Sequence, residues 1–159
     1  MGTTGLEAFD TTVHKTQVWL NDLMAELGWD DRHRAYLALR TVLHALRDHL
    51  TVETTAHLAA QLPLLVRGIY FEGWKPSGKP VRERHKEEFV GRVLQAFRGD
   101  SRVQSEAVVG AVFKVLSKHI EPGAVEHVLH VLPAEIRALW PRPPVRPASG
   151  AATAPQGDR

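Results

Sequence analysis

Apolar residues return every three or four positions along most of the chain, which is the spacing of an amphipathic helix. Short runs rich in glycine and proline separate these periodic segments, and none of the segments is convincing as a strand. The pattern predicts eight helices, so we expect an all-α fold. The clearest apolar stripe contains Tyr36, Leu39, Leu43, Leu46 and Leu50.

Residues that favour the ends of helices divide the chain further. Ser, Thr and Asp side chains accept hydrogen bonds from the free backbone N–H groups at a helix start, and proline fits the first turn. Gly28 suits the left-handed conformation that ends a helix. We expect helices to begin at Thr11 or Thr12, Asp30 or Asp31, Thr51, Pro63, Pro80, Ser101 with Gln104 as a capping box, Pro122 and Pro133.

The segments 40–70 and 110–140 are two copies of one pattern, offset by 70 positions without a gap. Similar apolar residues continue this register upstream, as in the pair Trp19 and Phe89. We therefore expect two tandem four-helix repeats that share one core about a pseudo-twofold axis. The identical pairs are Val42/Val112, Leu46/Leu116, His49/His119, His57/His127, Leu62/Leu132, Pro63/Pro133 and Arg67/Arg137.

A chain of 159 residues is long enough for one domain with a sizeable core. The C-terminal segment is rich in proline and alanine and has too few large apolar residues to offset the entropy of ordering, so we expect it to be disordered. The expected layout is a flexible N-terminus (1–8), one helical domain (9–141) with repeats at about 9–72 and 80–141 around a loop (73–80), and a disordered tail (142–159).

The charge of the chain is nearly balanced. The net charge is +2, and the tail supplies the excess, because residues 1–140 contain 17 basic and 17 acidic side chains. Non-specific nucleic-acid binding relies on a surplus of Lys and Arg, which the helical part lacks. The chain also has no cysteine, which excludes thiol catalysis and Cys-ligated zinc. Without a signal-like or membrane-spanning apolar run, we expect a cytoplasmic protein that does not enter a membrane.

Several motifs resemble a known bacterial family. They are a Leu-Pro-x-x-x-Arg step in each half, the run RGIYFEGW at 67–74, and the closing run LPAEIRALWP at 132–141. Together they make the chain similar to the domain of unknown function 2267 family over about residues 9–141. The resemblance implies a small, all-helical, bacterial cytoplasmic protein. It implies no activity, ligand or partner, so no functional residue is carried over from it.

A cluster of basic residues around a tryptophan follows the first repeat, and only Glu83 opposes it. Such a cluster can bind an acidic protein, a phosphorylated ligand or RNA, because Arg and Lys supply charge and Trp an apolar anchor. The structural alternative is that Trp74 folds back on the preceding helix and the cations are solvated. The candidate partner-binding residues are Arg67, Tyr70, Trp74, Lys75, Lys79, Arg82 and Arg84.

Arg67 and Arg137 follow Leu-Pro by the same distance, so one geometry is expected to serve both. The structural interpretation is a guanidinium that binds carbonyl groups at a neighbouring helix end or a nearby carboxylate. The functional interpretation is an anion site near the pseudo-twofold axis. We favour the structural interpretation, because repeated packing explains a repeated arginine.

Nine histidines raise the question of a metal site or a histidine-based enzyme. His127 and His130 are three residues apart, a spacing that can place both on one helix face. Their repeat equivalents do not complete a tetrahedral set, so we expect structural histidines and no metal or cofactor. His49 and His119 fall in the last turns of long helices, where the helix dipole favours a partly positive imidazole.

No local motif pairs a nucleophile with a base, which lowers the odds of an enzyme without excluding one. We therefore expect a non-enzymatic interaction or adaptor module that binds a protein partner through the basic, Trp-containing loop. A histidine-based metal protein or enzyme and a weak nucleic-acid binder are the alternatives. The sequence leaves the identity of the partner, any ligand and the oligomeric state open, and a homo-oligomer is compatible with it.

Overall fold

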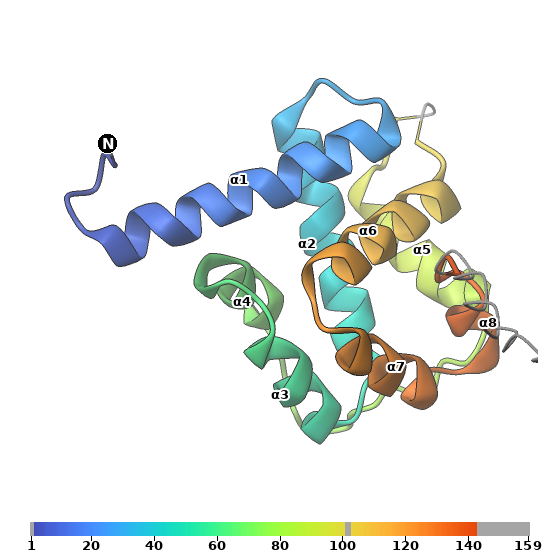
Figure 1. Ribbon diagram of the computed structural model, residues 1–159. Helices are drawn as coiled ribbons and strands as arrows, with labels where there is room; N and C mark the ends of the chain where they lie inside the picture. Colours follow the sequence, from blue (N-terminus) through green and yellow to red (C-terminus); the bar gives the residue numbers. More distant parts are fainter. Residues whose placement is uncertain (1, 101–102, 143–159) are drawn as a thin grey trace, which may run out of the picture.

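A computed structural model describes residues 2–100 and 103–142 of the chain, and these residues form eight α-helices and no strand (Figure 1). The expected all-α class is therefore confirmed. The tail from residue 143 and the proposed cap Ser101 lie outside the described residues. The helices are α1 (Glu7–Leu27), α2 (Arg32–Asp48), α3 (Val52–Ala60), α4 (Leu64–Phe71), α5 (Lys86–Ala96), α6 (Ser105–His119), α7 (Pro122–Val131) and α8 (Ala134–Arg137).

Several helix ends lie where the local sequence predicts them. The Asp31 carboxylate accepts hydrogen bonds from the backbone N–H groups of His33 and Arg34 and caps α2. Thr51 caps α3 by accepting from the N–H of Thr54 at 3.1 Å. Gly28 ends α1 with a φ of 66°, a left-handed conformation that glycine adopts without a steric penalty.

Three expected helix starts are wrong. α1 begins at Glu7 rather than at Thr11 or Thr12, and the hydroxyl oxygen of Thr12 instead accepts a hydrogen bond from the N–H of Leu65. α5 begins at Lys86 rather than at Pro80, because the preceding segment bonds to other parts of the chain. α6 begins at Ser105 rather than directly after Ser101, and the side chain of Gln104 before it makes no capping hydrogen bond.

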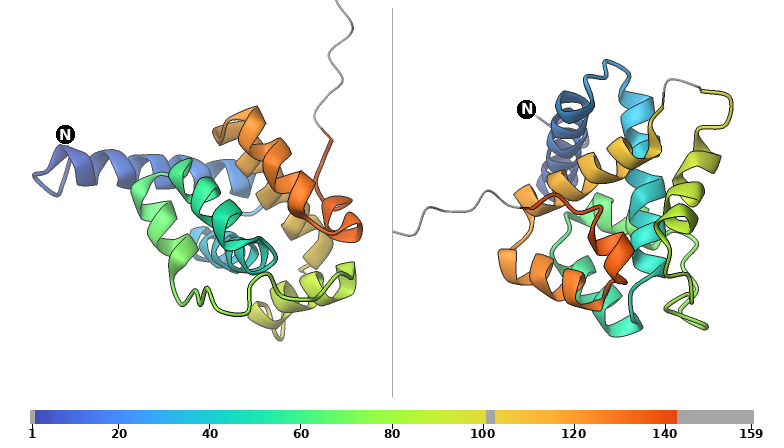
Figure 2. Two further views of the ribbon diagram at one scale, coloured as in Figure 1. Left: turned by 90° about the horizontal axis from the view of Figure 1, so that it is seen from below. Right: turned by 90° about the vertical axis from the view of Figure 1, so that its right-hand side faces the viewer.

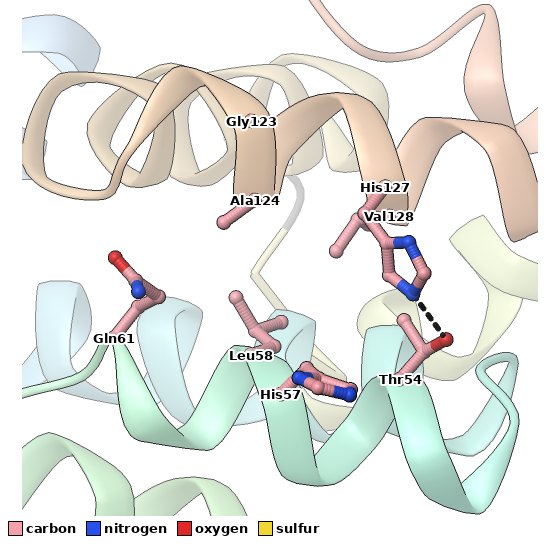
Figure 3. A pocket seen from close by; sticks show the side chains of 8 residues that line it. All are labelled: Thr54, His57, Leu58, Gln61, Gly123, Ala124, His127 and Val128. Carbon is pink, nitrogen blue, oxygen red and sulfur yellow. Dashed lines mark hydrogen bonds between the residues drawn. The ribbon is translucent and has the colours of Figure 1, made fainter.

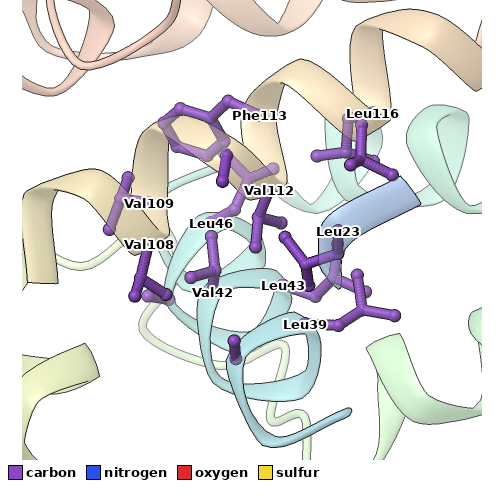
Figure 4. Packing of buried hydrophobic residues seen from close by; sticks show 14 of the residues in the cluster. Leu23, Leu39, Val42, Leu43, Leu46, Val108, Val109, Val112, Phe113 and Leu116 are labelled. Carbon is purple, nitrogen blue, oxygen red and sulfur yellow. The ribbon is translucent and has the colours of Figure 1, made fainter. Parts of the chain in front are cut away.

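The core is built around α2, which contacts α1, α4, α5 and α6. Leu39, Leu43, Leu46 and Leu50 of its apolar stripe are fully buried, and Tyr36 is half-buried. Figure 4 shows how the stripe meets α6 and α1 in a single cluster. The labelled side chains are Leu39, Val42, Leu43 and Leu46 from α2, Leu23 from α1, and Val108, Val109, Val112, Phe113 and Leu116 from α6.

Two helix pairs, α3 with α4 and α7 with α8, lie beside this core. α3 packs against α7 on one side of the molecule, and each is followed by a short helix that starts after a Leu-Pro step (Figure 1). The segment 72–85 connects α4 to α5 without regular secondary structure. It brings Arg82 and Arg84 close to the turn between α7 and α8.

Candidate partner-binding surface

The loop between α4 and α5 is held to the helices at two points. The N–H of Val81 donates to the carbonyl oxygen of Asp48 at the end of α2, over 2.9 Å. The carboxylate of Glu83 accepts two hydrogen bonds, at 2.9 and 3.0 Å, from the guanidinium of Arg92 on α5. Arg92 also reaches Asp48 at 3.4 Å. These contacts fix the backbone of the loop and compete with a helical start at Pro80.

A groove lies between this loop and the turn that joins α7 to α8. Arg82 and Arg84 are exposed on the loop side, while Glu83 between them turns toward Arg92. The groove has a volume of about 620 Å³, and residues some fifty positions apart in the sequence form its two walls. Its lining residues are His49, Pro80, Val81, Arg82, Glu83, Arg84, His130, Val131, Leu132, Pro133, Ala134 and Arg137.

Arg82 and Arg84 line the groove, and Lys75 and Lys79 precede them on the same loop. In the described part of the chain, Lys75, Lys79, Arg82 and Arg84 form no ion pair. The hydrogen bonds from Arg92 hold the pKa of the Glu83 carboxyl below its ordinary value, so that carboxylate is charged and already paired. The four cations are therefore available to a negative group from outside. We call Lys75, Lys79, Arg82 and Arg84, with the groove beside them, the basic surface.

Trp74 does not stand free of the body, although the sequence left that open. Its side chain is half-buried, and its ring lies 5.4 Å from the ring of Phe71 on α4, measured between centroids. Among the described residues, none accepts a hydrogen bond from its indole N–H. This is the packing that the structural alternative expects, and it makes Trp74 the edge of the surface rather than a projecting anchor.

Two further candidates lie beneath the surface. Tyr70 is fully buried, and its hydroxyl donates to the carbonyl oxygen of Thr55 at 3.1 Å. Burial raises the pKa of this phenol well above its ordinary value, so it stays neutral. Arg67 donates to the carbonyl oxygens of Ala59 and Leu62, at 2.8 and 3.0 Å. Both residues stabilise the α3–α4 corner through these hydrogen bonds.

His49 lies at the floor of the groove and carries a feature that the sequence did not show. Its Nδ1 lies 2.6 Å from the carbonyl oxygen of Ala45, and a carbonyl can only accept, so Nδ1 carries the hydrogen. Nε2 is then a buried acceptor, 3.3 Å from Glu83. Burial lowers the pKa of His49. We had expected the helix dipole to favour a partly positive ring, whereas burial, the largest cause of the downward shift, disfavours that charge.

The other histidines of interest meet between α3 and α7. His57 and His127 have ring centroids 5.8 Å apart, at the edge of a hollow of about 240 Å³ (Figure 3). His127 is within hydrogen-bond distance of the Thr54 hydroxyl, at 3.2 Å. Within residues 2–100 and 103–142, no three His, Asp or Glu side chains are arranged to hold a metal ion. This hollow thus presents two imidazoles without a third ligand.

Comparison with protein-family models gives one result. Residues 16–139 match the family described as uncharacterized conserved protein (DUF2267). The chain belongs to this family. The DUF2267 match covers the basic surface and both Leu-Pro-x-x-x-Arg steps, whereas the first nine residues of α1 precede it. No curated protein matches the chain. None of the helices in the described ranges is long and apolar enough to cross a membrane.

Proposed function

We propose that this DUF2267 protein is a non-enzymatic interaction module that binds an acidic segment of a partner protein on its basic surface. One observation carries the proposal: Arg82 and Arg84, two arginines without ion pairs inside the described structure, line a groove whose opposite wall is apolar. Charged groups on such a groove attract an acidic partner, and an apolar wall supplies the contact area that stabilises it. The remainder of the helical body has no comparable charge excess to offer.

The groove favours a protein segment over a nucleic acid. Val131, Pro133 and Ala134 provide an apolar wall opposite Arg82 and Arg84. Single-stranded nucleic acids are usually bound by cations combined with exposed aromatic rings on which bases stack. Trp74, the aromatic residue of this loop, packs on Phe71 instead. A chain of acidic residues alternating with small apolar ones would complement both the rim and the wall.

The test is affinity capture from a nuclease-treated lysate, followed by quantification of the captured proteins. The variant Arg82→Glu with Arg84→Glu reverses two exposed charges on the rim. The control, Lys15→Glu with Arg32→Glu, changes net charge equally on exposed positions of α1 and α2. We expect one protein to be captured by the native chain and by the control but lost with the rim variant. Equal capture by all three chains would refute the basic surface as a binding site.

We also infer that the eight helices are two copies of a four-helix unit about a pseudo-twofold axis. Arg67 and Arg137 support this, because Arg137 donates to Leu129 and Leu132, the residues 70 positions after the acceptors of Arg67. Contacts between the two halves also come in pairs that are related by the 70-residue offset. Trp19 stacks on His119 at 5.0 Å, and Phe89 lies against His49 at 5.1 Å. An experimental structure in which α1–α4 fails to superpose on α5–α8 would refute it.

A further inference from the structure

The N-terminal half of α1 extends beyond the helical body as an arm, far from α8 (Figures 1 and 2). The apolar stripe of α1 continues past the residues that pack in the core. Apolar residues at positions 6, 9, 13, 20, 23 and 27, together with Thr16, are spaced alternately by three and four residues, so they lie along one side of the helix. Leu20 and Leu23 of this stripe are buried, whereas Leu6, Phe9 and Val13 are 49%, 51% and 38% exposed.

The start of α4 adds to the same region. The N–H of Leu65 donates to the hydroxyl oxygen of Thr12 at 2.8 Å, which brings the first turn of α4 against the arm. Leu64 and Leu65 are 57% and 41% exposed. Five of the seven large apolar side chains that are strongly exposed in the described structure therefore belong to these two elements. We call Leu6, Phe9, Val13, Leu64 and Leu65 the arm patch.

Charge does not account for this exposure. Charged residues of opposite sign border the arm patch, because Glu7 and Lys15 line the same hollow as Leu64. Asp10 accepts hydrogen bonds from the N–H and the hydroxyl of Thr4, at 3.1 and 2.8 Å. A partner with a strong charge of either sign would gain little here. The arm patch of a second copy, which is equally apolar, fits this surface better.

We propose that the arm patch is the interface of a homodimer, in which the arms of two copies pack against each other. With about 150–200 Å² for each large apolar side chain when fully exposed, the patch presents about 400 Å² per copy. Two copies then bury at most about 800 Å² of apolar surface, so a stable interface of 1,200–2,000 Å² would also include polar residues around the patch. A twofold axis supplies the same surface on both sides.

This interface is independent of the basic surface. The arm begins before residue 16, where the family match starts, while the basic surface lies between α4 and α8. Because the arms project from the bodies, two copies can pair through them and leave both grooves open. A dimer would then present two basic surfaces to one partner, which raises the overall affinity for a partner with two acidic segments.

Sedimentation velocity of the full chain from about 1 to about 100 μM tests the proposal. The native protein is expected to approach twice the 17.7 kDa of one chain. Phe9→Glu with Leu64→Glu should remain at the mass of one chain throughout. Leu94→Glu is the matched control, because Leu94 is an apolar residue of α5 that is 51% exposed and lies outside the patch.

A far-ultraviolet circular dichroism spectrum establishes that each variant is folded, and the milder pair Phe9→Ser with Leu64→Ser replaces the glutamate variant if that one unfolds. A native protein that stays at the mass of one chain would overturn the proposal. So would a dimer that survives the folded arm variant, since its interface would lie elsewhere. Loss of the dimer in Leu94→Glu would overturn it as well.

Discussion

The segments at the ends of α4 and α8 are anchored by opposite chemistry, although both belong to the same Leu-Pro-x-x-x-Arg corner. Behind α4, the buried guanidinium of Arg47 donates to the carbonyl oxygens of Tyr70 and Glu72, at 2.6 and 2.7 Å. Seventy positions after Arg47 stands Ser117, and there the direction is reversed. The indole N–H of Trp140 donates to the Ser117 hydroxyl at 2.7 Å.

The difference shows which part of the corner is constant and which is adjustable. The arginine that follows Leu-Pro makes matching carbonyl contacts in both places, so it secures the turn between the short helices. The residue three positions after each arginine is held by a side chain of the neighbouring long helix, which is Arg47 on α2 and Ser117 on α6. α4 runs for eight residues and α8 for four, and Arg47 satisfies two carbonyl groups at the end of α4.

The largest expected effect is at Arg47. Replacing it with methionine keeps most of the buried volume but leaves the carbonyl groups of Tyr70 and Glu72 without a donor and Asp48 without its 3.3 Å ion pair. We expect the free energy of unfolding to fall by about 3 kcal/mol in urea titrations. The matched change Ser117→Ala should cost about 1 kcal/mol, because Ser117 is exposed and water can replace its hydroxyl. Equal losses would contradict the asymmetry.

Tyr70→Phe should come next. The substitution keeps the buried ring and removes only the hydroxyl that bonds to the carbonyl of Thr55. Leaving that buried acceptor unpaired should lower the free energy of unfolding by about 1.5 kcal/mol. Thermal unfolding followed by circular dichroism measures it. A variant as stable as the native chain would indicate that the hydroxyl makes no net contribution to anchoring α4.

The two constant arginines provide the sharpest test of the shared corner. Arg67→Met and Arg137→Met each remove two hydrogen bonds to helix-end carbonyls, and we expect each to cost about 1 kcal/mol in urea titrations. Arg67 is the less exposed of the two, so its loss should be slightly the larger. A loss at one position only would mean that the corners are equivalent in geometry but not in energy.

The smallest effect concerns pH. Burial holds the pKa of His49 below its ordinary value, so the unfolded chain binds this proton more readily than the folded one. The free energy of unfolding should therefore be constant above about pH 6.5 and fall as the pH drops below it. His49→Gln should flatten this decline. His44, whose pKa burial also lowers, will retain part of it.

The contact at the matching position in the other half should give a different dependence of stability on pH. His119 lies 2.6 Å from Asp22. Burial alone would raise the pKa of Asp22, but the hydrogen bonds from His119 and Lys118 outweigh it and the net shift is downward. Asp22→Asn should therefore remove a contribution that is constant above about pH 4 and vanishes in acid. A decline below pH 6.5 that disappears in Asp22→Asn but not in His49→Gln would show that Asp22, and not His49, causes it.

Much of the fold could be read from the sequence, because helix periodicity and local caps decide it. Asp31, Thr51 and Gly28 act within their own helices, so their roles are visible locally. The starts of α1 and α5 were not predictable in this way. Leu6 precedes α1 without a side-chain cap. Pro80 suits a helix start, but hydrogen bonds from Val81 and to Glu83 hold its segment against α2 and α5.

The candidate site was visible only in part. The basic cluster is contiguous in the sequence, so Arg82 and Arg84 could be found there. Burial of Tyr70 and the packing of Trp74 depend on tertiary contacts with Thr55 and Phe71. The second wall of the groove comes from α7 and α8, about fifty residues downstream, and no local signal connects it to the loop.

The central position of α2 has a consequence for how the molecule opens. This helix contacts four others, and its apolar stripe is covered along its length, so no partial opening can free its backbone without separating several helices at once. The arm of α1 has few such neighbours. Native-state hydrogen exchange should therefore divide the chain sharply, with the amides of α2 exchanging only when the whole domain unfolds and those of the first turns of α1 exchanging by local fraying.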